Sequence, residues 1–390
     1  MKIALMNTTL LTSRQTIPDG CLLMADEKIT AAGSFTDLQI PSGYLRVDLK
    51  GMYTAPGLID LQINGGFGCD FTRTPATIWK VGEQLAQFGV TAFLPTIVTA
   101  PLEVSDQAMK VIKEGRPPNY LGAEPLGLHL EGPFLNPKKK GAHSPLYLQL
   151  PAPEKINHWT AQNGVRLVTL APELPRALEL VKKLCDQGVV VSAGHSMANY
   201  AQALSGFEAG IRFGTHIFNA MPAMDHRSPN LSGALLSDPR IRVGIIADGI
   251  HVHPAMVKLV WLAKKAGGLT LVSDAMAALG MDLGKYVLGN EEVIVDQTSA
   301  RLKDGTLAGS ILKQNVALRN LIQYCGCSPE EAIRTFTLTP ANGLNIQDSY
   351  GSLEVGKRSD VVVFDRQFNV QMTIVGGQPV YLNDSIKPSL

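Results

Sequence analysis

The sequence predicts an α/β protein: a (β/α)8 TIM barrel with a small β-sandwich domain formed by both termini. Between residues 58 and 275, apolar β-branched runs alternate with helical patterns, and eight such runs occur. Continuous apolar strands joined by helices are typical of a parallel sheet covered on both faces. Eight units in roughly 220 residues fit a barrel that usually takes about 250. Short strand-like runs at both ends of the chain predict the second, smaller domain.

The predicted barrel strands are short runs rich in Val, Ile and Leu. They lie near residues 58–64, 92–98, 125–131, 165–171, 189–195, 212–218, 243–249 and 269–275. Between them, PELPRALELVKKLCDQG (172–188) and HPAMVKLVWLAKKAGG (253–268) have helical patterns that close on glycine.

The two ends of the chain have a different sequence pattern from the middle. KIALMNTTLL near the start and RSDVVVFDRQFNVQMTIVGGQPVY near the end are short apolar runs punctuated by turns. Neither piece alone could bury two faces, so we expect residues 1–53 and 346–390 to join in one β-sandwich domain. Residues 54–345 then form the catalytic barrel.

Composition excludes several classes of partner. The chain has 35 Lys and Arg residues against 34 Asp and Glu, and no basic block is longer than Lys138–Lys140. This balance indicates no nucleic-acid and no membrane partner, and we expect those three lysines to lie on a solvated loop. No stretch approaches the ~18 apolar residues of a spanning helix, and the N-terminus lacks an apolar signal region. Five cysteines without a C-x-x-C pair predict free thiols and a cytoplasmic location.

Polar side chains stand at the carboxyl ends of the predicted strands, which is where such barrels build their active sites. They are Gln62, Asn64, His129, Glu131, His195, His216, Asp248 and Asp274. Their shared position predicts one site assembled from several strands.

Glu131, His195 and His216 are the predicted metal ligands. One carboxylate and two imidazoles suit zinc or a similar divalent ion, and three protein ligands leave a position open for water, as catalytic sites do. Either histidine alone could be a satisfied core residue; the combination with Glu131 favours a metal site. Asp274 would otherwise be a turn cap, but beside a metal-bound water it is placed to act as the general acid and base. His129 lies a layer deeper than Glu131 and is expected to support the site or pack in the core.

Several longer motifs resemble the N-acetylglucosamine-6-phosphate deacetylases of the amidohydrolase superfamily. They are LHLEGPFLNPKKKGAH (128–143), SAGHS (192–196), THIFNAM (215–221), DGIH (248–251), SDAMAALG (273–280) and GTLAGS (305–310). The tail GSLEVGKRSDVVVFD (351–365) and the opening PGLID are typical of the wider superfamily.

The resemblance implies a hydrolase that removes the acetyl group from N-acetyl-D-glucosamine 6-phosphate, giving D-glucosamine 6-phosphate and acetate. It assigns Glu131, His195 and His216 to the metal and Asp274 to acid/base catalysis. His143 would stand near the acetyl carbonyl, where a donor stabilises a developing oxyanion. The implied substrate contacts are Ala142, Asn219, Ala220, Arg227, His251, Leu307, Ala308 and Gly309. Because the family's Arg227 reaches the neighbouring subunit's site, the resemblance also implies a homodimer.

The segment PGLIDLQINGG (56–66) carries Gln-x-Asn where relatives with two metals carry His-x-His. Neutral amides bind transition metals poorly compared with imidazole, so we predict one divalent ion per subunit. Zn²⁺ is the first expectation; Fe²⁺, Co²⁺ and Mn²⁺ suit the same ligands. Two alternatives are open: hydrolysis of another amide, cyclic or N-acyl, and a non-catalytic oligomeric scaffold.

Overall fold

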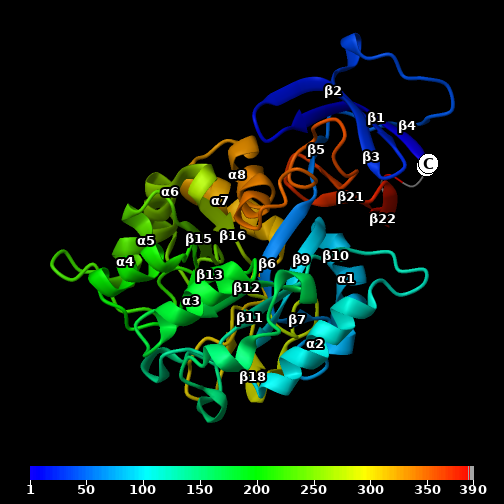
Figure 1. The fold of residues 1–390 in the computed structure, drawn as a ribbon. Helices are drawn as coiled ribbons and strands as arrows, with labels where there is room; N and C mark the ends of the chain where they lie inside the picture. Colours follow the sequence, from blue (N-terminus) through cyan, green and yellow to red (C-terminus); the bar gives the residue numbers. More distant parts are fainter. Residues whose placement is uncertain (385, 387–390) are drawn as a thin grey trace.

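The computed structural model describes residues 1–384 and 386, and its larger part is a parallel barrel (Figure 1). Eight strands form the ring, and each pairs with its neighbour in parallel register. In ring order these are β6 (Leu58–Ile63), β9 (Val90–Val98), β11 (Leu128–Glu131), β12 (Val165–Leu170), β13 (Val190–Ala193), β14 (Phe213–Gly214), β15 (Arg242–Ile245) and β16 (Leu269–Leu271). A two-residue strand, β10 (Glu124–Pro125), also pairs with β9. The predicted (β/α)8 architecture is confirmed.

The barrel closes between its last and first strands through the residues that follow β16. The Asp274 amide donates to the Gln62 carbonyl at 2.8 Å, and the Asn64 amide donates to the Ala275 carbonyl at 2.7 Å. The closure therefore lies at the carboxyl ends of both strands, so the backbone that completes the ring also brings Asp274 beside Gln62 and Asn64.

Helices cover the outside of the ring, and α1, α3 and α6 bury apolar residues against its strands. They are α1 (Ile78–Leu85), α2 (Leu102–Glu114), α3 (Ala177–Asp186), α4 (Tyr200–Ala209), α5 (Asn230–Ser237), α6 (Pro254–Gly268), α7 (Gln314–Cys325), α8 (Pro329–Thr335) and α9 (Leu338–Gly343). Local sequence sets several starts: Asn199 with Gln202 and Ser328 with Glu331 form capping boxes before α4 and α8. Among the described residues, no helix combines the length and apolarity needed to cross a membrane.

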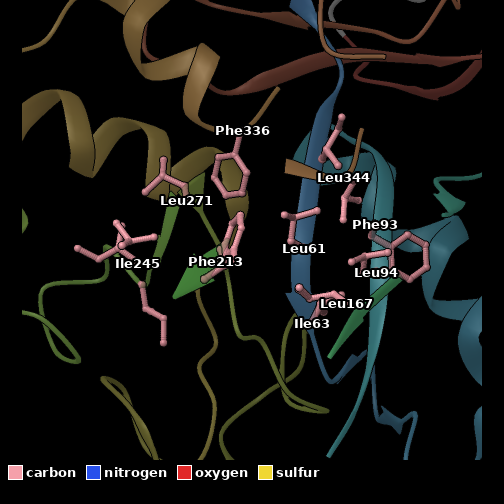
Figure 2. Packing of buried hydrophobic residues seen from close by; sticks show 14 of the residues in the cluster. Leu61, Ile63, Phe93, Leu94, Leu167, Phe213, Ile245, Leu271, Phe336 and Leu344 are labelled. Atoms are coloured by element: carbon pink, nitrogen blue, oxygen red, sulfur yellow. The ribbon is translucent and has the colours of Figure 1, made fainter. Parts of the chain in front are cut away.

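The main core fills the space between strands and helices. Figure 2 shows side chains from β6, β9, β12, β14, β15 and β16 packed with Phe336 and Leu344 from the segments that follow α8 and α9. Phe93, Leu271 and Phe336 are fully buried. This packing holds the strand ends, and hence the side chains that leave them, in fixed positions.

Both termini enter one mixed sheet beside the barrel, as predicted; Figure 1 shows its blue and red strands together. Its order is β22 (Gln378–Leu382), β21 (Val370–Val375), β20 (Val361–Phe364), β5 (Tyr53–Pro56), β1 (Lys2–Leu11), β2 (Thr16–Ala25) and β3 (Lys28–Ser34), with β4 (Leu45–Asp48) paired to β1. Ile3 and Leu22 from one end share a buried cluster with Val363 and Ile374 from the other. The domain boundaries at residues 53 and 346 stay predictions. Strand β5 lies in this sheet and extends to Pro56, just past the first of them.

A small antiparallel sheet after the eighth barrel strand has no counterpart in the predicted elements. It comprises β17 (Gly284–Leu288), β18 (Glu291–Val295) and β19 (Ala300–Arg301). Its apolar face packs with Val98, the last residue of β9, and with Ala142 and Met276 from segments that follow barrel strands. A further pair of two-residue strands, β7 (Gly65–Gly66) and β8 (Cys69–Asp70), follows β6. The β17–β19 sheet therefore lies over one side of the barrel mouth.

Candidate active site

A cavity of about 620 Å³ opens at the carboxyl ends of the barrel strands. The predicted residues that line it are Glu131, Ala142, His143, His195, His216, Asn219, Ala220, His251, Asp274, Leu307 and Gly309. They come from different strands and loops, and the fold brings them to one place. This is the end of the barrel at which such enzymes carry their chemistry.

Glu131, His195 and His216 meet on the buried floor of the cavity. Glu131 Oε1 lies 3.2 Å from His195 Nε2 and 3.0 Å from His216 Nε2. The two Nε2 atoms are 3.0 Å apart. Among residues 1–384 and 386, these three side chains are the one group of His, Cys, Asp or Glu whose ligand atoms converge closely enough to hold a metal ion.

The chemistry of the three donors fits a divalent cation. A tetrahedral ion with ligands at about 2.0–2.1 Å keeps those ligands about 3.3–3.4 Å apart, close to the separations here. His195 Nδ1 donates to the Lys139 carbonyl at 2.8 Å, which leaves Nε2 with its lone pair facing the other two donors. Although burial alone would raise it, the adjacent His195 and His216 imidazoles hold the pKa of Glu131 well below its ordinary value. The carboxylate is thus kept anionic, as a ligand must be.

Backbone conformation aims three of the site side chains inward. His195, His216 and Asp274 have φ of 48°, 27° and 49°, in the left-handed region that non-glycine residues rarely enter. Two glycines make room around them: a Cβ on Gly141 would lie 3.1 Å from the His195 ring, and one on Gly309 would lie 3.0 Å from the Asp274 carbonyl. Such strain persists where the surrounding structure enforces it, and it concentrates at functional sites.

Asp274 is held beside the cluster by the amides of the first strand. Asn64 Nδ2 donates to Asp274 Oδ1 at 2.8 Å. Gln62 Nε2 donates to Asp274 Oδ1 and to Glu131 Oε1, both at 3.1 Å. Burial and the nearby Glu131 carboxylate raise the pKa of Asp274 to about 6. The carboxylate is therefore poised to exchange a proton near neutral pH.

His143 offers a hydrogen-bond donor to the cavity. Its Nδ1 accepts from the backbone amide of Thr99 at 3.2 Å, so the ring proton sits on Nε2. That Nε2 lies 3.8 Å from Glu131 Oε2. Burial, together with the neighbouring His195, lowers the pKa of His143 to about 3. The imidazole is thus neutral, and its Nε2–H is available as a donor in the cavity.

Two residues implied as substrate contacts stand outside the cavity wall. Ala308 is fully buried in the apolar cluster of the β17–β19 sheet, one position from Leu307 and Gly309, which do line the cavity. Arg227 is exposed in a turn closed by paired hydrogen bonds between Asp225 and Ser228. Arg227 does not line the cavity of its own chain.

Asp248 supports the site in a way that the sequence analysis did not predict. His251 Nδ1 donates to Asp248 Oδ2 at 2.7 Å, and the other carboxylate oxygen accepts from the backbone amides of Ile250 and His251. Although burial alone would raise it, the hydrogen bond from His251 holds the pKa of Asp248 below its ordinary value. The sequence spacing D-x-x-H, on a loop that follows a strand, is the feature from which this Asp248–His251 pair could have been predicted.

The cavity wall also contains charged and apolar residues that were not assigned to it. Lys138, Lys139 and Lys140, which were expected on a solvated loop, also line it. Arg301 reaches it from β19, and Nη1 of that arginine donates to the Gly305 carbonyl at 2.8 Å. The apolar residues are Val98, Pro137, Ile246 and Leu288. Arg301 and Leu288 could not be placed from sequence, because they belong to the small sheet that the strand pattern did not reveal.

His129 takes the supporting place expected of it. Its two ring nitrogens contact Thr96 Oγ1 at 3.2 Å and Thr169 Oγ1 at 2.8 Å. Burial lowers the pKa of His129 to about 4, so the imidazole is neutral. It lies outside the group whose ligand atoms converge.

Comparison with known proteins decides the family. The model of the amidohydrolase family matches residues 53–380, most of the chain. The chain belongs to the amidohydrolase family. This amidohydrolase is 41% identical to the N-acetylglucosamine-6-phosphate deacetylase of Mus musculus over 357 residues, covering 87% of this chain and 86% of the relative. The Bacillus subtilis enzyme of the same name is 34% identical over 380 residues, 96% of both chains.

Solved structures agree with this placement of the amidohydrolase. N-acetylglucosamine-6-phosphate deacetylase from Pasteurella multocida superimposes with a TM-score of 0.92 at 31% identity, over 98% of this chain and all of the other. A mutant of the Mycobacterium smegmatis enzyme, solved in complex with N-acetyl-D-glucosamine-6-phosphate, gives 0.90 at 31% identity with the same coverage. The family prediction made from the motifs is confirmed.

Proposed function

We propose that this chain is a metal-dependent deacetylase of N-acetyl-D-glucosamine 6-phosphate that releases acetate and D-glucosamine 6-phosphate. One observation carries this proposal: the three convergent donors Glu131, His195 and His216 share a buried floor with an acid/base candidate, Asp274, and an N–H donor, His143. Close relatives over most of the chain carry the same activity in their names.

The arrangement supports hydrolysis of an amide. When bound by Glu131, His195 and His216, a divalent cation acts as a Lewis acid toward water and toward the acyl carbonyl. Asp274 takes a proton from the attacking water. His143 donates its Nε2–H to the carbonyl oxygen as negative charge develops there. Asp274 then returns the proton to the amine nitrogen as the C–N bond breaks, and the balance is one amide and one water consumed for one amine and one acetate.

We assign one cation per subunit and expect Zn²⁺, since two imidazoles and a carboxylate suit it; Fe²⁺, Co²⁺ and Mn²⁺ are the other candidates. Gln62 and Asn64 support the single-ion assignment because their side-chain N–H groups are engaged with carboxylates. With their N–H groups facing Glu131 and Asp274, these amides act as donors to the carboxylates that surround the ion.

The sugar phosphate is assigned to the wall formed by Asn219, Ala220 and His251, which lies across the floor from the β17–β19 sheet. Arg227 completes this wall from a second subunit, so we propose a homodimer. Its exposed position outside its own cavity supports that assignment. We also propose a cytoplasmic location, because all five cysteines are free thiols, as in proteins of reducing compartments.

A second substrate is favoured by one relative. The N-acetylgalactosamine-6-phosphate deacetylase of Escherichia coli O157:H7 is 39% identical over 327 residues, 83% of this chain and 86% of that protein. The two sugars differ at one hydroxyl group, so the same floor residues could serve both. The scaffold alternative is disfavoured because the complete set of donors is present.

Acetate release measured on purified protein tests the proposal. N-acetylglucosamine 6-phosphate, N-acetylgalactosamine 6-phosphate and unphosphorylated N-acetylglucosamine would be compared by kcat/KM. We expect turnover of at least one phosphorylated sugar and a large preference over the unphosphorylated one. Metal-replete protein that releases no acetate from either phosphate would overturn the assignment.

A further inference from the structure

The active-site cavity has two chemically different ends. Asn219, Ala220 and His251, from the loops after the sixth and seventh strands, form a polar end. Val98, Ala142 and Leu288 form an apolar end of the lining and belong to one buried cluster, while Arg301 and Asp304 line the same cavity from β19 and the turn that follows it. A substrate whose amide lies at the floor must extend one substituent toward each end.

Strand register places Val98 of the apolar end directly beside Glu131. Val98, the last residue of β9, pairs with Glu131, the last residue of β11, so the two stand at the same height in the barrel. The next residue, Thr99, donates its backbone amide to His143 at 3.2 Å and its hydroxyl to the Glu131 carbonyl at 3.2 Å. Val98 is therefore fixed next to Glu131, a proposed metal ligand, and His143, the proposed donor to the acyl carbonyl.

The β17–β19 sheet closes this end with a rigid turn. Leu288 ends β17, and the following Gly289 donates its amide to Asp70 Oδ2 at 2.9 Å. A Cβ on Gly289 would lie only 3.1 Å from Val98 Cγ2, so the turn packs tightly against that residue. Val98 in turn donates its amide to Thr72 Oγ1 at 3.0 Å. Leu288 and Val98 are only 5% and 6% exposed, so both side chains are packed on most of their surface.

We propose that Val98, Ala142 and Leu288 form the acyl pocket and that Leu288 and Val98 set its depth, limiting the acyl group to the size of acetyl. This rests on the proposed deacetylation. The sugar binds toward Asn219 and His251, the carbonyl oxygen faces His143, and the methyl group contacts the apolar wall. Longer acyl chains collide with Leu288 and Val98, because a close-packed wall does not yield to an added methylene without cost.

The test compares N-acetyl-, N-propionyl- and N-butyrylglucosamine 6-phosphate on the metal-loaded protein. We expect the wild type to prefer acetyl strongly. Leu288→Ala and Val98→Ala should each raise the ratio of kcat/KM for N-butyryl to that for N-acetyl at least about tenfold, the scale on which a hydrophobic pocket discriminates one or two methylenes.

Val293→Ala is the matched control. Val293 is fully buried in the same cluster but does not line the cavity, so its truncation loosens the sheet without deepening the pocket. Its butyryl-to-acetyl ratio should stay within twofold of wild type. Unchanged butyryl-to-acetyl ratios in both Leu288→Ala and Val98→Ala, or an equal rise in Val293→Ala, would overturn the acyl pocket. If the wild type still released acetate from the N-acetyl substrate, the deacetylase assignment would stand. A wild type inactive on N-acetyl would instead refute that assignment, and the pocket with it.

Discussion

The Asn64 side-chain amide donates to Asp274 at 2.8 Å, from the strand position where relatives with two metals carry a histidine. Gln62, two residues earlier, bridges Asp274 and Glu131 with one amide nitrogen. The first strand therefore orients the two carboxylates of the site by donating hydrogen bonds. With one ion per subunit, as we propose, Gln62 and Asn64 position these carboxylates and do not bind metal.

The hydrogen bond from Asn64 is one of the contacts that lower the pKa of Asp274, against the burial that raises it to about 6. Asp274 must be ionised to accept a proton, so kcat/KM should fall as pH drops below this pKa. A bound cation lowers the pKa of Asp274, so the midpoint of the acidic fall in kcat/KM lies at pH 6 or below. In Asn64→Leu this midpoint should rise by about one pH unit, because the ionised Asp274 loses a charge-assisted hydrogen bond. A pH–rate profile of both proteins measures this, and a midpoint unmoved or moved downward would contradict it.

Replacing Asp274 by Asn removes the acid/base group but keeps its shape. We expect acetate release to fall about 10²–10⁴-fold because no other group takes the proton from water. Metal content, measured by elemental analysis, should equal that of wild type because Asp274 is not among the three converging donors. Turnover near the wild-type rate would rule out the role given to Asp274.

Removing a ligand should remove the ion. His216→Ala is expected to purify with little bound metal, whereas wild type binds about one equivalent per chain. His129→Gln is the control: that histidine is equally buried but is held by Thr96 and Thr169. It should keep its metal yet lose about 1–3 kcal/mol of unfolding free energy by leaving the threonine hydroxyls imperfectly paired. Two equivalents in wild type would refute the single-ion site.

Asp248 should act on substrate binding through His251. In Asp248→Asn the imidazole loses its charged acceptor, and we expect KM for the phosphorylated sugar to rise about tenfold with a smaller change in kcat. Because both residues serve one contact, Asp248→Asn combined with His251→Gln should be no worse than His251→Gln alone. Additive losses in the double variant would show that Asp248 acts elsewhere.

Arg227 can be tested by mixing two inactive proteins. In a dimer of Arg227→Ala with Asp274→Asn, one site has an intact Asp274 and receives Arg227 from its partner. Random re-pairing of equal amounts makes about half of the dimers mixed, so recovery of about a quarter of wild-type activity is expected. The separate proteins should stay nearly inactive on the phosphorylated sugar. Without recovery despite confirmed exchange of subunits, Arg227 does not act across an interface.

The strand pattern alone was sufficient for the barrel, because periodicity and β-branched runs are local properties that survive into the fold. Each predicted barrel strand overlaps an observed one, although the sixth shrinks to Phe213–Gly214. The β17–β19 sheet escaped prediction because its short strands are half-exposed and lack a continuous apolar run. Leu288 and Arg301, which it carries to the cavity, were therefore unassigned.

By itself, the sequence determined which groups this protein has for chemistry and at which strand ends they lie. Glu131, His195, His216 and Asp274 were predictable because residue type and the rule for barrel strand ends are enough to select them. Only the tertiary structure decided what each group faces. The Gln62 bridge, the neutral His143, the pairing of Asp248 with His251 and the apolar wall at Val98 depend on contacts between residues far apart in the chain, which are set by packing and register rather than by local pattern.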